Sequence, residues 1–136
     1  MKLHPDRIAA ANVIGGYNAG SVDVGGRSWD HSLLLPWAGE IIAWDSASFE
    51  ALSATHFQRV ADFEPELVLF GSGRRLRFPR PEWLRPLMIK RIGIETMDTR
   101  AACRTYNLLV AEGRSVVAAL LLEAADDPSD PSHRPL

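Results

Sequence analysis

Two short polar segments of the chain carry the residue types best suited to binding an anion. The first follows the apolar run at 67–70 and consists of Gly71, Ser72, Gly73, Arg74 and Arg75. Glycine-rich turns expose backbone N–H groups that hold phosphates or carboxylates, and arginine binds both anions bidentately. The alternative is structural, because glycines also permit a sharp exit from a strand. We favour the structural alternative, since neither GxGxxG nor GxxxxGK(S/T) is present.

The second segment follows the apolar run at 92–97 and begins with Asp98 and Thr99. Either residue can cap a helix that starts here, and this role explains both without catalysis. Asp98 is also the one acid or base expected near the first segment. Arg100, Arg104 and Asn107 face away from the apolar stripe of that helix, so they are either solvated or part of a binding rim. For Asn107 a structural hydrogen bond is the simpler interpretation.

Motifs of catalysis and metal binding are absent from the sequence. The four histidines are scattered, and the chain contains no CxxC, HExxH or GxSxG pattern. Cys103 lies at the edge of an apolar helical stripe with no histidine near it in sequence, which favours a buried, inert thiol. We therefore expect no metal, no cofactor and no catalytic set, and an enzyme is kept as one of the alternative hypotheses below.

The elements that position the two polar segments alternate between strand and helix. Apolar runs at 67–70, 92–97 and 116–122 are separated by helix-like stretches, the pattern of a parallel βαβαβ core. Right-handed crossovers would place the ends of the first two strands at the same edge of the sheet. The sequence thus predicts that both polar segments meet at that edge.

A β-hairpin layer is expected before this core. Ser21–Val24 and Arg27–Trp29 flank Gly25-Gly26, a pair that suits a two-residue turn. Alternation of side chains extends the second strand from Trp29 to Leu35, and Ile41–Trp44 could pair back with it. A helix follows to Phe63. The predicted fold is α/β, a single compact three-layer (β+β/α) domain.

The 136 residues fit one domain, which we place at 1–125, followed by a Pro- and Asp-rich tail at 126–136 that we expect to be disordered. No apolar run is long enough to cross a bilayer and no signal peptide is recognisable, so the expected location is cytoplasmic. The lone Cys103 agrees with a reducing compartment. Trp37 and Trp44 are compatible with a homodimer, but the sequence does not fix the oligomeric state.

Charge is distributed unevenly along the chain. Residues 74–91, called here the basic segment, contain seven arginines or lysines and one acid, a net charge of +6, against −8 for the remainder. This surface is either simply solvated or suited to an acidic protein face or anionic headgroups. Phe78 and Trp83 could stack on a nucleic-acid strand, but the overall pI of about 6.1 argues against a dedicated nucleic-acid protein.

Three motifs occur in order in this chain: residues 65–73, residues 93–107 from Gly-Ile-Glu-Thr-Met-Asp-Thr to Thr-Tyr-Asn, and Glu112-Gly113-Arg114. This combination resembles a small uncharacterised family, the Mth-type domain of unknown function, which includes the mitochondrial complex I assembly factor 3. The resemblance implies a compact layered domain, and it implies protein binding rather than an established reaction.

Three hypotheses follow. The first is a non-enzymatic binding module, an accessory or assembly factor for a larger complex that is respiratory or membrane-associated. Its partner would contact the sheet edge that carries Gly71 to Arg75 and Asp98 to Asn107. The second is an enzyme or small-ligand binder that holds an anionic group at the turn from Gly71 to Arg74. The third is nucleic-acid binding through the basic segment.

Overall fold

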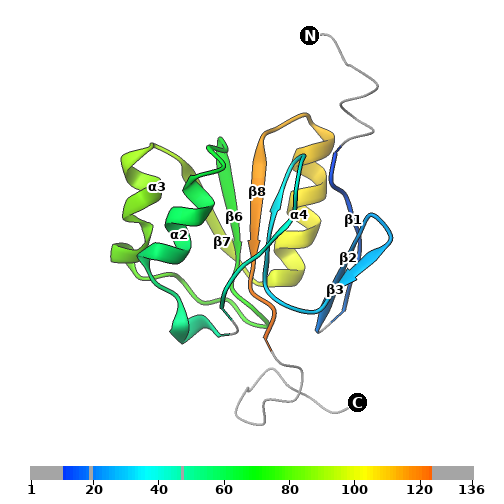
Figure 1. Cartoon of the computed structure of the whole chain (residues 1–136), viewed down its shortest axis with the longest axis horizontal. Helices are drawn as coiled ribbons and strands as arrows, with labels where there is room; N and C mark the ends of the chain where they lie inside the picture. Colours follow the sequence, from blue (N-terminus) through cyan, green and yellow to red (C-terminus); the bar gives the residue numbers. More distant parts are fainter. Residues whose placement is uncertain (1–10, 19, 47, 124–136) are drawn as a thin grey trace.

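Two β-sheets organise the chain in the computed structural model, which describes residues 11–18, 20–46 and 48–123 (Figure 1). The smaller sheet has three antiparallel strands in the order β1-β2-β3. The larger has five strands in the order β5-β4-β8-β6-β7. The described residues also form three α-helices and two short 3-10 helices. The expectation of a mixed α/β domain is confirmed.

The predicted hairpin is present in the smaller sheet. β2 (Ser21–Val24) and β3 (Arg27–Trp29) pair across Gly25 and Gly26, whose φ angles are 58° and 79°. Two consecutive positive φ angles are what a tight hairpin turn of this kind requires, and glycine adopts them without strain. β1 (Ile14–Asn18) pairs with β2 on its other side, and its register shifts between Ile14 and Gly16, which makes a β-bulge.

The expectation of one continuous strand from Trp29 to Leu35 is wrong. β3 ends at Trp29, and the chain crosses to the larger sheet before β4 (Leu33–Pro36) begins. Ser32 fixes the crossing, because its Oγ accepts a hydrogen bond from Leu122 N at 2.9 Å while its carbonyl accepts one from Trp44 N. β5 (Ile42–Ala43) does pair back with β4, as expected.

The parallel core is confirmed. β6 (Leu67–Gly71) pairs in parallel with β7 (Gly93–Met97) on one side and with β8 (Val116–Leu120) on the other. α4 (Thr99–Ala111) connects β7 to β8. The connection from β6 to β7 contains the 3-10 helix η2 (Pro81–Leu84) and α3 (Arg85–Ile89). Pro86 lies in the first turn of α3, where its missing N–H costs no hydrogen bond.

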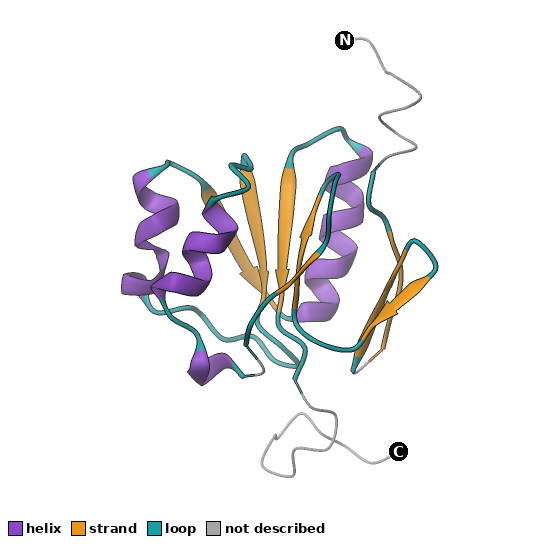
Figure 2. Cartoon of the chain, viewed as in Figure 1, coloured by secondary structure: helices purple, strands orange, loops and turns teal. Residues whose placement is uncertain are grey.

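Helices lie over both faces of the five-stranded sheet (Figure 2), and each face has its own core. α2 (Ala54–Ala61), α3 and both 3-10 helices, including η1 (Phe49–Ala51), cover one face. α4 and the smaller sheet cover the other. β4 is buried along its whole length because its leucines alternate between the two cores. A strand buried on both faces is apolar throughout rather than alternating, which explains its leucine run.

Trp44 and Trp37, considered above for a homodimer, belong to the core that contains α2. Trp44 is 2% exposed and Trp37 packs against the same cluster. Within the described residues, no helix has the length and apolar character needed to span a bilayer. The tail expected at 126–136 lies entirely outside the described residues.

Candidate functional site

The two polar segments meet where the parallel strands end, as predicted. Gly73 N donates to Thr99 Oγ1 at 2.9 Å, and Thr99 N donates to Gly73 O at 2.8 Å. The Thr99 hydroxyl in turn donates to Leu121 O, just after β8, at 2.8 Å. One buried threonine therefore links the carboxyl ends of all three parallel strands. We call Gly71, Ser72, Gly73 and Thr99 the corner.

Close packing, rather than an open loop, accounts for both glycines of the corner. A Cβ at Gly71 would lie 3.0 Å from Thr99 Cα, and one at Gly73 would overlap the Glu123 carboxylate. Gly73 also has a φ of +102°, in a region that other residues adopt only with strain. These contacts agree with the structural interpretation of the two glycines.

Ser72 folds the chain after the corner back on itself. Its side chain is buried, with Oγ 2.7 Å from Arg75 O and accepting from Arg77 N at 3.0 Å. The Arg77 guanidinium donates to Ser72 O from Nη2 at 2.6 Å. These bonds hold the start of the basic segment in one conformation.

An internal carboxylate stands where the second hypothesis expected a ligand. Arg77 Nη2 donates to Glu123 Oε1 at 2.5 Å, and Arg74 N donates to the same oxygen at 3.4 Å. The side chains of Arg77 and Glu123 are only 15% and 16% exposed. Neither residue was among those singled out in the sequence. The position of Glu123 beyond the third parallel strand, at the same edge as the two polar segments, was the available signal.

Asp98 and Asn107 have structural roles. The Asp98 carboxylate accepts from Ala101 N at 2.9 Å and so caps α4, as predicted. Asn107 Oδ1 accepts from Ile14 N at 2.9 Å while its Nδ2 donates to Ile14 O at 2.8 Å. This pair of bonds attaches β1 to α4, which confirms the expected structural hydrogen bond.

A small cleft of about 260 Å³ opens beside Asn107, between β1 and α4. Arg100 and Arg104 line one wall, and the opposite wall carries Tyr17 and the bulge of β1. The Arg100 guanidinium lies 5.5 Å from the centre of the Tyr17 ring. Of the predicted site residues, Arg104 and Asn107 both line this cleft, whereas Arg74 and Arg75 do not.

Cys103 borders the small cleft but is buried beneath it. Burial, followed by the negative charge of Asp98, raises the pKa of the Cys103 thiol to about 12. A thiol with this pKa carries almost no thiolate near pH 7 and is a poor nucleophile. The expectation of an inert thiol agrees with this environment.

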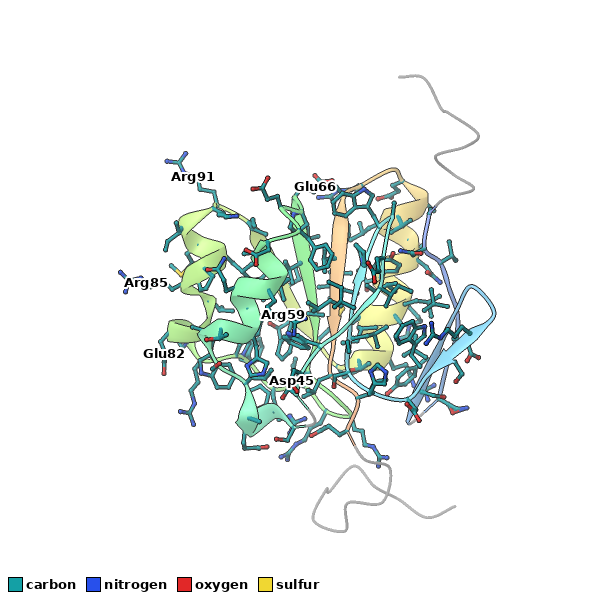
Figure 3. All side chains as sticks on the ribbon, viewed as in Figure 1. Asp45, Arg59, Glu66, Glu82, Arg85 and Arg91 are labelled. Carbon is teal, nitrogen blue, oxygen red and sulfur yellow. The ribbon has the colours of Figure 1, made fainter. Side chains whose placement is uncertain are left out.

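A second, larger cleft of about 770 Å³ was not predicted from the sequence. Ser32, Trp44 and Leu122 form part of its lining, together with Asp45 and Arg59, which Figure 3 labels near each other in front of the sheet. These residues come from four separate segments and share no motif, so no local sequence signal marks the cleft. Glu123 borders it and connects it to the corner.

The basic segment leaves the corner and forms one flank of the molecule (Figure 1). Figure 3 shows Arg85 and Arg91 pointing outward from this flank. Trp83 is 7% exposed and packs against Phe49 and Phe57, so it is not available to stack on a nucleic-acid base. The sequence-based suggestion of a Phe78 and Trp83 stacking pair is therefore wrong for Trp83.

Comparisons with known proteins place the chain in a family. A family model described as "Protein of unknown function (DUF498/DUF598)" matches residues 14–121. The cattle (Bos taurus) protein named NADH dehydrogenase (ubiquinone) 1 alpha subcomplex assembly factor 3 is 34% identical over 104 residues. The match covers 75% of this chain and 55% of that relative, so the chain spans little more than half the relative's length.

Solved structures agree with this fold. A crystal structure of a Bordetella parapertussis protein has a TM-score of 0.80 and 38% identity, covering 84% of this chain and 98% of that one. A solution structure from Bordetella pertussis, described as a Mth938-like domain, has a TM-score of 0.77 and 33% identity, covering 91% and 94% respectively. The resemblance read from the three sequence motifs is confirmed.

Proposed function

Because this chain belongs to the family described as proteins of unknown function DUF498/DUF598, which includes relatives named as complex I assembly factor 3, we propose that it is a non-enzymatic module that binds protein and assists the assembly of a larger complex. The surface that we assign to the partner is the basic segment, which begins at the corner and ends at the start of β7.

One observation carries this assignment: the basic segment combines positive charge with exposed apolar side chains. Seven large apolar residues are exposed in the described part of the chain, and four of them lie in this segment: Leu76, Phe78, Met88 and Ile89. Phe78 is 70% exposed and Ile89 73%. Arginine and large apolar residues together are typical of protein interfaces, and they dominate binding energies there. A merely solvated face does not require the apolar residues.

The charge of the segment indicates the chemistry of the partner. A net charge of +6 over 18 residues favours an acidic protein face, and it would speed the encounter at low ionic strength. Arg75, Arg80, Arg85 and Arg91 are exposed, whereas Arg77 is held by Glu123. In this account Arg77 shapes the segment and the exposed arginines contact the partner.

The beginning of the segment is ordered before any partner arrives. The bonds from Ser72 and Glu123 to Arg77 fix the chain between the corner and Leu76. A surface that is already ordered loses less conformational entropy on binding, which raises affinity without new contacts. This is the role that we assign to the corner, in place of the anion cradle of the second hypothesis.

Affinity purification tests the proposal. The tagged chain is recovered from its native cells under mild conditions, and the co-purifying proteins are quantified by mass spectrometry. We expect a stoichiometric partner that is lost when Phe78 and Ile89 are both changed to serine. The matched control is Leu108→Ser, because Leu108 is 67% exposed on α4, outside the segment. Retention of a tightly bound small metabolite with no protein partner would contradict the proposal.

Ionic strength separates this function from nucleic-acid binding. Nucleic-acid affinity that depends on several phosphate contacts falls steeply with salt, by about 10³-fold or more between 50 and 200 mM. The purification is therefore repeated at about 50 and 200 mM salt. Nucleic acid that co-purifies at low salt, is lost at high salt and is retained by the Phe78→Ser/Ile89→Ser variant would contradict the assembly-factor proposal.

A further inference from the structure

Two exposed arginines line the small cleft. Arg100 and Arg104 lie one turn apart on α4 and both are exposed. Like charges at this spacing repel one another and slightly destabilise a helix. Among the described residues neither arginine forms an ion pair. Asp98 caps the helix, and its negative charge acts on Tyr17 and Cys103 at the cleft without pairing with either arginine. An anion placed between the two guanidinium groups would remove this repulsion.

The opposite wall of the cleft is formed by β1, with Ile14, Gly15, Gly16 and Tyr17. Gly15 and Gly16, at the bulge of β1, contribute backbone rather than side chains. Tyr17 lines the cleft with its ring beneath the Arg100 guanidinium, and it carries a hydroxyl group. Burial, and then the neighbouring Cys103, raise the pKa of Tyr17, against the opposing effect of Arg100 and Arg74. The phenol therefore stays protonated at neutral pH and can donate a hydrogen bond.

The two walls are held at a fixed separation. Asn107 joins β1 to α4 through its two hydrogen bonds to Ile14, and Tyr106 Oη lies 2.8 Å from Asn12 O and 2.9 Å from Pro36 O. The cleft is thus preformed, and a ligand that enters it need not order these elements. Its volume of about 260 Å³ is below the usual range for drug-sized ligands, roughly 300–1,000 Å³. A small anion fits, whereas a dinucleotide does not.

The geometry points to a binding site for a small carboxylate or phosphate, held between Arg100 and Arg104 with Tyr17 as a further donor. Guanidinium groups bind both anions through paired, charge-assisted hydrogen bonds. No residue of the basic segment lines this cleft, so a negative result for the anion site would leave the protein-binding proposal unchanged. It also differs from the anion site expected at the turn from Gly71 to Arg74, which Glu123 fills.

Nuclear magnetic resonance titration tests this site. The isotopically labelled chain is titrated with sodium phosphate and, separately, with sodium succinate, at constant ionic strength and pH 7. We expect saturable shifts of the amide signals of Gly15, Gly16 and Tyr17 with at least one of the two anions. A response to phosphate alone assigns a phosphoryl ligand, a response to succinate alone assigns a carboxylate, and a response to both supports the shared chemistry.

Two variants and one control decide the outcome. Arg100→Gln and Arg104→Gln should each weaken the titrated affinity by about tenfold, the loss of one charge-assisted contact. Arg75→Gln, which removes an equally exposed arginine from the basic segment, should leave it unchanged. The two glutamine variants keep a helix-forming side chain at exposed positions, so their spectra should remain those of the folded chain. Failure to saturate with either anion by about 20 mM, or an affinity in both glutamine variants equal to that of the parent chain, would overturn the site.

Discussion

Replacing Glu123 by glutamine tests how much the internal ion pair contributes to stability. The variant keeps the shape of the side chain and one carbonyl oxygen but removes the charge that Arg77 and the Arg74 N–H contact. A hydrogen bond to a charged group contributes about 1.5–3 kcal/mol, and breaking a fully buried pair costs about 3–5 kcal/mol. Since both side chains are about one-sixth exposed, we expect a loss of about 2 kcal/mol.

Urea unfolding of the purified chain measures this loss directly, through a lower midpoint at unchanged slope. The matched control is Glu64→Gln, because Glu64 pairs with Lys90 at 3.4 Å and its side chain is 75% exposed. A surface pair of this kind contributes about 0–1 kcal/mol. Equal, small losses in the two variants would show that the Arg77–Glu123 contact does not hold the corner and the basic segment together.

Three further predictions concern the corner, the attachment of β1 and the buried thiol. Gly73→Ala should lower the free energy of unfolding by about 3 kcal/mol, because φ is +102° and the new methyl group meets Glu123. Gly25→Ala is the control: its methyl group would meet no atom within 4 Å, so the positive φ alone should lower the free energy of unfolding by about 1 kcal/mol. Asn107→Ala should cost about 2 kcal/mol in urea unfolding and increase hydrogen exchange of the Ile14 amide, and an unchanged exchange rate would contradict its role. The raised pKa of Cys103 should make the free energy of unfolding fall as pH rises from about 9 towards 12, since only the unfolded chain ionises its thiol readily in this range. Cys103→Ala should reduce this pH dependence. A variant whose stability falls as steeply with pH as that of the parent chain would refute the prediction.

Local signals in the sequence were sufficient for several elements. Gly25-Gly26 marks a turn that requires positive φ, and Asp98 precedes an apolar stripe at helical spacing. The three apolar runs at strand length, separated by helices, favour parallel pairing. Each of these features depends on residues within a few positions of one another, so it can be predicted from the sequence. The meeting of the two polar segments then follows from the parallel direction of the strands.

Other features depend on partners that are distant in the sequence. Arg77 and Glu123 are 46 residues apart, and no pattern in the sequence pairs them. The alternation predicted from Trp29 to Leu35 fails where the chain changes sheets: Asp30 and His31 are both exposed, and residues 32–36 are all buried. Trp83 and Ile89 both look apolar in sequence, yet one is buried and the other 73% exposed. Only the packing of η2 and α3 decides between them.

Hydrogen–deuterium exchange on the purified complex tests the central claim most directly. Exchange of the backbone amides is compared between the free chain and the chain with its co-purified partner. The account predicts that protection gained on binding is concentrated in residues 74–91, most strongly around Phe78 and Ile89. Protection confined to the large cleft or to the smaller sheet, with residues 74–91 unchanged, would contradict it.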